Sequence, residues 1–377
     1  MDESSFPSSQ SLPLHVACIY RRPDVIKTLL ECGAKVDAPD WAGRTPLEIV
    51  LFYWPRIPCT DGIDPKSSYG KYQSYLRDQH ARSLRCMRQL IEKGANIQAK
   101  VSRSILNRRG QSFLHCTALN TLPLAAEWLL RYGADIEARD DEGRTPLITA
   151  AMLPCLKVAE LLMSLGADTN AQDVRGNAPL HYLVYRGRDY LVRLALELGA
   201  NSNAANDEHL TPLHVAAEIG NSNAIRLLLL YGANPNSLDN RGRSALFCVL
   251  DDTANAGNSS RLGISLLLRE TLYTKVTDKT GNLCKLLNHE RFVHLRDTLI
   301  LYTSEPPTLL KMCKVAIRKS IGLRKISGTN VDKLPLPTAL KRYIFSPWCF
   351  YCRRCECYRQ NHPKTIPSTI HLKIPSP

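Results

Sequence analysis

The chain has 377 residues, of which 44% are hydrophobic and 7% aromatic, and this is the composition of an ordinary soluble folded protein. Its longest aliphatic runs, such as residues 227–230, are too short to cross a bilayer, and residues 1–10 lack the basic start and apolar run of a signal or transit peptide. The formal net charge is +14, but residues 305–377 hold fourteen Lys and Arg against three acids. Because no base-reading motif accompanies this basic tail, we do not expect specific nucleic-acid binding.

The cysteines indicate the compartment. Nine of the thirteen are scattered singly, mostly at apolar helical positions, where a free cysteine packs as a small hydrophobic side chain. This distribution favours a reducing compartment and no disulfide framework. We therefore expect a cytoplasmic or nuclear protein.

A repeat runs through most of the chain. The dipeptide Gly-Ala occurs six times, beginning at Gly33, Gly94, Gly133, Gly166, Gly199 and Gly232, and the last four copies are 33 residues apart. Twelve residues after Gly199, the next unit opens with the segment Thr211-Pro212-Leu213-His214. A 33-residue period with this segment resembles the ankyrin repeat. The resemblance implies an all-α solenoid of about seven repeats plus a degenerate cap, over residues 9–303, after a flexible N-terminus at residues 1–8.

The residues of one unit also explain its expected structure without the family name. Thr211 is a natural N-cap, and Pro212 suits the first position of a helix because that position needs no N–H donor. A second helix is expected around residues 225–230, and Gly232 ends it because glycine adopts the left-handed conformation at low cost. Each unit buries its apolar face only by stacking on the next, so the array forms one continuous core.

Four histidines occupy the same place in the period. They are His15, His115, His181 and His214. A functional interpretation is metal binding or acid–base chemistry. Recurrence at one position of a structural repeat favours a structural hydrogen bond between adjacent units instead.

The end units depart from the pattern. Leu12 stands where threonine is expected, and the unit near 240 has a lengthened turn at residues 251–260. A turn of the form Asp-x-x-Gly, such as Asp239–Gly242, is predicted to form a projecting finger, and a last degenerate unit opens with the same form at Asp278–Gly281. Atypical terminal units are typical of capping repeats.

The second unit contains an insertion. It runs from Trp41 to Lys100, and its excess, about residues 53–80, holds several prolines and glycines. Proline and glycine break helices, so we predict a loop between the two helices of this unit. Its aromatic residues suit a substrate-binding loop, since Trp and Tyr dominate interface hot spots; they are Trp54, Tyr69, Tyr72 and Tyr75. A neutral insertion is the alternative, because surface loops tolerate added length.

After residue 303 the pattern changes. Two prolines at 306 and 307 block continuation of a helix, and Thr308 can cap a new one. Leu309, Cys313 and Ile317 then recur every four residues on one helix face. The segment Leu334-Pro335-Leu336-Pro337 follows and precedes a second short helix at residues 338–345.

These two motifs resemble the two halves of a SOCS box. The segment from Thr308 to Ile317 looks like the elongin-binding box, and the segment from Leu334 to Pro337 looks like the Cullin-5 box. Both motifs, in this order and directly after ankyrin repeats, resemble the ankyrin-repeat and SOCS-box protein family. The resemblance covers roughly residues 9–345 and implies a small helical SOCS box at 304–345.

The resemblance implies partners and roles. Leu309 would insert into a pocket of elongin C, with Thr308, Cys313 and Ile317 on the same segment, in a helix-in-groove mode. The rigid Pro335 and Pro337 would present Leu334 and Leu336 to Cullin-5 at little ordering cost. No cofactor, metal or small molecule is implied.

A cysteine-rich basic tail follows at residues 346–377. Its four cysteines are Cys349, Cys352, Cys355 and Cys357. Zinc binding is one interpretation, although four ligands within nine residues can hardly wrap a tetrahedral site. Lipidation is another, and a poorly ordered segment is the one we favour.

The leading hypothesis is a non-catalytic adaptor, the substrate-recognition subunit of a Cullin-5 RING ubiquitin ligase with elongins B and C. The array would bind an unknown protein target. The alternative is an ankyrin scaffold for protein–protein interaction without ligase activity. No glycine-rich phosphate loop, paired-metal motif or nucleophile elbow indicates an enzyme, and a nucleic-acid binder would show a steep loss of binding with salt.

Overall fold

The computed structural model describes residues 12–55, 68–101, 110–153, 156–251, 263–264, 266–267 and 277–282. The chain divides into two compact units, Met1–Ser304 and Glu305–Pro377, and every described residue belongs to the first. The fold can therefore be followed through the repeat array.

The described residues form thirteen α-helices, further helical residues at 263–264 and 266–267, and two isolated β-bridges, which confirms the all-α prediction. In chain order the helices are α1 (Pro13–Ile19), α2 (Pro23–Glu31), α3 (Pro46–Phe52), α4 (Ser68–Glu92), α5 (Phe113–Leu119), α6 (Pro123–Arg131), α7 (Pro146–Ala151), α8 (Leu156–Ser164), α9 (Pro179–Tyr185), α10 (Asp189–Glu197), α11 (Pro212–Glu218), α12 (Ser222–Leu230) and α13 (Ala245–Asp251).

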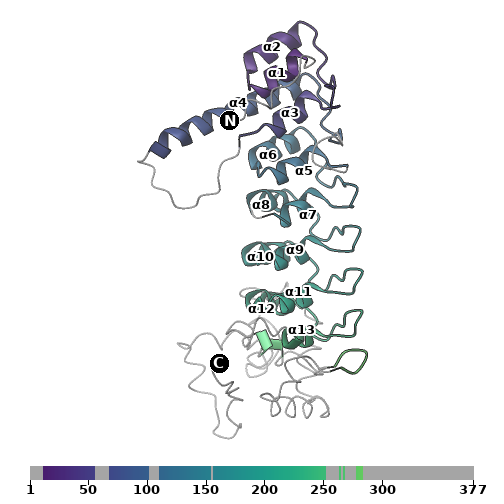
Figure 1. Ribbon diagram of the computed structural model, residues 1–377. Helices are drawn as coiled ribbons and strands as arrows, with labels where there is room; N and C mark the ends of the chain where they lie inside the picture. The colour runs from purple at the N-terminus through teal and green to yellow at the C-terminus, as the bar shows by residue number, and fades with distance from the viewer. Residues whose placement is uncertain are drawn as a thin grey trace, which may run out of the picture. The chain divides into compact units, whose positions relative to one another are not determined.

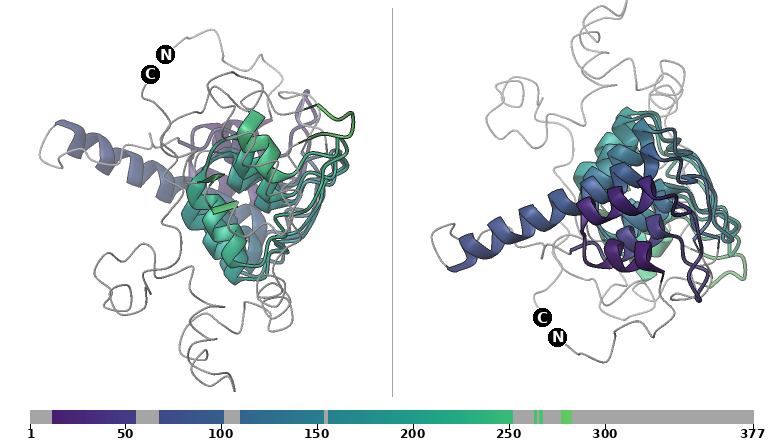
Figure 2. Two further views of the ribbon diagram at one scale, coloured as in Figure 1. Left: turned by 90° about the horizontal axis from the view of Figure 1, so that it is seen from below. Right: turned by 90° about the horizontal axis from the view of Figure 1, so that it is seen from above.

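The helices alternate between two stacks. We call the odd-numbered helices the first helices and the even-numbered ones the second helices. Each first helix packs on the next first helix, and its second helix lies beside it (Figure 1). The turns between units project on the side of the first helices (Figure 2), and we call them the fingers. The buried apolar residues of all the units form one core cluster, as the stacking predicted.

Local chemistry explains the helix ends. Thr211 is the N-cap of α11 and Pro212 its first residue, as predicted. The second helix begins at Ser222, three residues before the predicted Ile225, because the side chain of Asn221 accepts the N–H of Ala224 at 3.0 Å and caps it. Gly232 follows with φ +84°, the left-handed conformation expected of it.

The fingers are held by one carboxylate or amide each. In the finger at 239–243, Asp239 Oδ1 accepts the N–H groups of Arg241 at 2.9 Å and Arg243 at 2.7 Å. Asp278 repeats the first contact with Thr280 at 2.8 Å. The predicted last unit therefore begins with a finger of the same kind.

Neighbouring fingers are joined through their backbones. The N–H of Val174 donates to the carbonyl of Glu142, Asp207 to Arg175, Asn240 to Glu208, and Lys279 to Arg241, at 2.9–3.0 Å. These bonds form a ladder across five successive fingers. The position of each finger is thus set by its neighbours.

The predicted loop at 53–80 is wrong from Ser68 onward. There α4 begins and runs for 25 residues, whereas a second helix such as α12 has 9. Gly70 lies inside this helix, and Ser83, Cys86 and Leu90 lie on its fully buried side. The N-terminal part of α4 extends beyond the other second helices, away from the fingers (Figures 1 and 2).

Membrane spanning was tested on the helices within the described ranges. None of them combines the length and the apolar character needed to cross a bilayer.

Candidate protein-binding surface

The recurring histidines lie in the interior and join neighbouring units. In each of the four, Nε2 lies 2.8–3.2 Å from a backbone carbonyl 29 residues further along; these carbonyls belong to Arg44, Arg144, Leu210 and Arg243. The prediction of a structural bond between adjacent repeats is confirmed. Among the described residues no group of three His, Cys, Asp or Glu side chains is placed to hold a metal ion.

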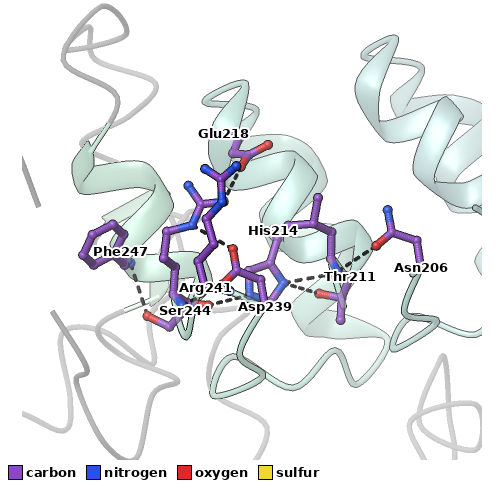
Figure 3. Close-up of polar contacts among 10 residues, drawn as sticks. Asn206, Thr211, His214, Glu218, Asp239, Arg241, Ser244 and Phe247 are labelled. Atoms are coloured by element: carbon purple, nitrogen blue, oxygen red, sulfur yellow. Dashed lines mark hydrogen bonds and ion pairs between the residues drawn. The ribbon is translucent and has the colours of Figure 1, made fainter. Parts of the chain in front are cut away.

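The protonation state of these histidines follows from their partners. His214 Nδ1 accepts the backbone N–H of Thr211 at 3.2 Å (Figure 3), so the proton of the neutral ring is on Nε2 and is donated to the carbonyl of Arg243. His115 and His181 make the same pair of contacts. Burial lowers the pKa of all three rings, although the hydrogen bond to the carbonyl opposes the change. These rings hold the repeats together and are not free for acid–base chemistry.

The fingers carry ion pairs at their base. Arg243 Nε donates to Asp239 Oδ2 at 2.7 Å, and its Nη2 lies 3.4 Å from Glu218 Oε1. The same pairing joins Arg44 to Asp40 and Arg144 to Asp140. Each of these arginines is partly buried, and the pair stiffens the finger that carries it.

The finger at 173–177 uses a tyrosine in place of the arginine. The hydroxyl of Tyr182, on α9, donates to Asp173 Oδ2 at 2.6 Å. Burial, and then the neighbouring Asp173 carboxylate, raise the pKa of Tyr182 to about 12. The finger-facing side of α9 is thereby fixed against the base of its own finger.

Large apolar side chains are exposed on the finger side of the array. Trp41, at the tip of a finger, is 66% exposed, and Tyr185, at the end of α9, is 61% exposed. Val174, at the tip of the finger at 173–177, is also exposed. Side chains of this kind on a rigid support are typical of protein-binding surfaces.

The sequence reasoning missed these three residues. Their signal is their place in the period. Each stands at a tip or helix-end position where the repeat requires no buried side chain, and yet each is apolar. Comparison of equivalent positions across the units would have found them.

The predicted substrate-binding loop is corrected at Trp54. This residue is only 4% exposed, and its indole N–H donates to His80 Nδ1 at 2.7 Å. It packs inside the protein because it links the end of α3 to α4. Tyr75 is 57% exposed and remains available on α4. Tyr69 and Tyr72 lie within α4, and their side chains fall outside the described part.

The predicted docking residues lie outside the described residues. This holds for the elongin-binding set (Thr308, Leu309, Cys313 and Ile317), for the cullin-binding set (Leu334, Pro335, Leu336 and Pro337), and for the four tail cysteines. Their roles stay predictions.

Family models match both the repeat array and the segment that follows it. The family model for ankyrin repeats in three copies matches residues 79–173 and 166–240, and a single ankyrin repeat matches residues 10–38. The family model for the SOCS box matches residues 305–344, a range that includes both predicted docking motifs.

Known proteins support the fold. A stretch of 149 residues is 29% identical to the chicken (Gallus gallus) nuclear factor NF-kappa-B p105 subunit, covering 37% of this chain and only 14% of that protein. The crystal structure of the ankyrin repeat domain of Bcl-3, a member of the IkappaB protein family, matches with a TM-score of 0.51 and 24% identity, over 68% of this chain and 98% of that one. At this identity the likeness shows the fold alone.

The stacked helix pairs, the fingers and these matches define an ankyrin-repeat solenoid. A SOCS box follows the repeats in the same chain. The chain therefore belongs to the ankyrin-repeat and SOCS-box protein family.

Proposed function

We propose that this protein is the substrate-recognition subunit of a Cullin-5 RING ubiquitin ligase. The array binds a protein target, and the SOCS box binds elongins B and C and the cullin. The observation that carries the proposal is the succession of ankyrin repeats and a SOCS box in one chain. Ankyrin repeats present an extended binding surface, and the SOCS box is the part that would connect it to a ligase.

The elongin contact is proposed for the helix that the sequence predicts after Thr308. Leu309 is the anchor that enters a pocket of elongin C, and Cys313 and Ile317 extend the same apolar stripe. Cys313 acts there as a small hydrophobic side chain rather than as a nucleophile.

The cullin contact is proposed for residues 334–337. Pro335 and Pro337 restrict the backbone before binding, so that little conformational entropy is lost when Leu334 and Leu336 meet Cullin-5. In the resulting complex the subunit is not itself catalytic. It accelerates ubiquitin transfer by holding the target near the reacting groups. We propose the cytosol or nucleus as its location.

The array is suited to target binding by its construction. Its buried histidines and finger ion pairs fix the frame, and the exposed Trp41 and Tyr185 stand on that frame. A rigid support lowers the entropy lost when a partner binds.

Co-expression with elongins B and C tests the proposal. The wild-type chain should co-purify with both elongins, and Leu309→Asp should abolish this, because it puts a charge into an apolar pocket. Lys311→Asp is the matched control, since two residues correspond to a rotation of about 200° in the predicted helix, so that residue 311 would face away from residue 309. Retention of elongins by Leu309→Asp, or their absence from the wild type, would overturn the proposal and leave an ankyrin scaffold without ligase activity as the remaining reading.

A second experiment addresses the target. In a pull-down with neddylation inhibited, target proteins should be retained by the wild type and by a variant altered at Leu309 and at Leu334–Pro337. In cells, the same proteins should accumulate only with the variant. An unchanged abundance of every retained protein contradicts the ligase role.

A further inference from the structure

The ends of the first helices form a row along the array. Its members are the last residue of each first helix or, for α7, the cap residue directly after it. Five successive members are apolar and the last two are acidic. The apolar members are Ile19, Phe52, Leu119, Met152 and Tyr185, and the acidic ones are Glu218 and Asp251. We call the set the helix-end row.

The helix-end row lies on the finger side of the array. Glu218 shows this directly, because its carboxylate contacts Arg243 in the finger of the next unit. One turn before Tyr185, Tyr182 contacts Asp173 in the finger of its own unit. No member of the row is buried, and Tyr185 is the most exposed apolar member. The row is therefore accessible from the same side as the finger tips.

The five apolar members follow one another without a charged residue. Packed helices lie roughly 8–10 Å apart, so these five span about 35 Å. Tyr185 is exposed and the other four are partly exposed, and the guanidinium of Arg186 lies 5.9 Å from the centre of the Tyr185 ring. Isolated apolar residues are ordinary on a surface, whereas these five recur at one position of successive units and could contact one partner together. Tyr and Met are also among the residue types enriched in interfaces.

The acidic end of the row is surrounded by further carboxylates. Asp207 and Glu208 are exposed at the tip of the finger before Glu218, and Asp239 lies in the finger after it. Burial raises the pKa of Glu218, Arg243 and Arg241 lower it, and the negative charges of Asp239 and Glu208 raise it.

Three basic residues, Arg241, Arg243 and Lys279, lie among these carboxylates. Arg243 pairs with Asp239 at 2.7 Å and also contacts Glu218. Counted over the described residues of this end, the five carboxylates of Asp207, Glu208, Glu218, Asp239 and Asp251 exceed the three basic groups by two. A positively charged partner group would meet a favourable potential there.

We propose that the helix-end row binds a segment of the target protein in which apolar residues are followed by a cluster of Lys or Arg. The apolar residues face Ile19 to Tyr185, and the basic cluster faces Glu218 and Asp251. The inference rests on the proposed role of the array in target binding and adds the chemistry of the bound segment. Apolar contact gives most of the affinity, and the charge fixes the direction of the segment along the array.

Selection from a phage-displayed library of random peptides tests the proposal on the full-length chain. Peptides of about 16 residues are long enough, since an extended chain advances roughly 3.3 Å per residue. Wild-type protein should enrich peptides with several apolar residues and a basic cluster at one end. The most enriched peptide, labelled and titrated, should lose at least tenfold in affinity with Met152→Asp or Tyr185→Ala.

The charge at the end of the row is tested separately. Glu218→Gln combined with Asp251→Asn should weaken the same peptide about tenfold and remove the preference for Lys and Arg in a repeated selection. Both substitutions keep the shape of the side chain, so the fold is retained, and circular dichroism verifies this. The matched controls are Tyr190→Ala and Glu31→Gln, on the second helices α10 and α2, and they should leave binding unchanged.

Two results would overturn the inference. One is enrichment of acidic or wholly polar peptides by the wild type. The other is binding that survives the helix-end substitutions but is lost with the controls on α10 and α2. The outcome is independent of the elongin experiment, because peptide selection can be repeated on Leu309→Asp, which should bind the same peptides whether or not the SOCS box docks.

Discussion

Trp54 donates its indole N–H to Nδ1 of His80 at 2.7 Å, and this bond joins the end of α3 to the middle of α4. The two rings meet edge to face, with their centroids 6.0 Å apart. Because Nδ1 accepts, the neutral ring carries its proton on Nε2. Burial lowers the pKa of His80, and the charge of Arg21 lowers it further, so the acceptor form is the favoured one. The long helix of the second repeat is thus attached to the array by a specific polar contact.

Trp54→Phe should reduce the free energy of unfolding by about 1–3 kcal/mol, because it keeps a ring in place and leaves Nδ1 of the partly buried His80 without its donor. Chemical denaturation measures the change. Hydrogen exchange should also speed up in the N-terminal turns of α4. Trp41→Phe is the control, since Trp41 is exposed at a finger tip, and an equal loss in both variants would show that the His80 contact contributes nothing.

The buried histidines predict an acid-sensitive array. Burial lowers the pKa of His115, His181 and His214 in the folded state, whereas in the unfolded chain a histidine titrates near about 6.5. The unfolded state therefore binds more protons as the pH falls, and stability decreases below about pH 6.5. Protonation would also place a hydrogen on Nδ1, where a backbone N–H already donates.

Thermal unfolding measured from pH 7.5 to pH 5.5 checks this dependence. His115→Asn lacks a titrating group at one of the three positions and should show a flatter profile, at a lower stability throughout. A melting temperature that does not change with pH would contradict the prediction.

Gly176→Ala should lower the free energy of unfolding by more than about 2 kcal/mol. The residue has φ +73°, and an added Cβ would lie 3.0 Å from Asn206 Cα and from the Asp207 nitrogen in the adjacent finger. Gly166→Ala is a matched control with φ +89° and no heavy atom within 4 Å of the added Cβ, so it has only the conformational cost of about 1–2 kcal/mol. Equal losses in the two variants, measured by denaturant titration, would show that the contact with the adjacent finger adds nothing to the cost of Gly176→Ala.

His209→Gly should raise the free energy of unfolding by up to about 1 kcal/mol. His209 has φ +57° at the finger position where Gly43, Gly143 and Gly242 stand in other units, so a side chain is held in a conformation that glycine adopts freely. His209→Ala keeps the strained conformation and should bring no gain. Equal stability of the two variants would show that no strain is relieved there.

The regular part of the fold could be predicted from the sequence because each repeat contains its own residues that begin and end its helices. Thr211, Pro212 and Gly232 mark helix ends in ways that do not depend on the neighbours. The start of α12 was misplaced because the capping role of Asn221 depends on a side-chain contact that spacing does not reveal.

The insertion could not be predicted correctly, for a physical reason. Its prolines and glycines suggested a loop, and the polar Gln79 and Ser83 interrupt the apolar stripe that would have indicated a helix. In the folded protein these two side chains are buried, and Ser83 donates its hydroxyl to the backbone carbonyl of Gln79 at 3.0 Å. Packing against the first two repeats outweighs the local signal.

The candidate surface could be predicted only in part from the sequence. Aromatic residues in an insertion suggested an exposed site, and Trp54 proved to be interior while Trp41 and Tyr185 are exposed. Exposure depends on which neighbours stack on a residue, and composition alone does not determine this. The SOCS-box motifs were recognisable because their residues follow one another closely in the sequence, as the family match at 305–344 bears out.

The backbone ladder between the fingers has a consequence for how such a protein can change. Val174, Asp207 and Asn240 each make an inter-finger bond with a main-chain N–H, which any residue except proline can supply; only Asn240 among these three adds a side-chain bond, from Nδ2 to the carbonyl of Asp207 at 3.0 Å. Exchange of the tip residues between related chains should therefore transfer partner preference while leaving the fold intact. The tip side chains, which would determine partner preference, can thus change while the main-chain bonds between the fingers are kept.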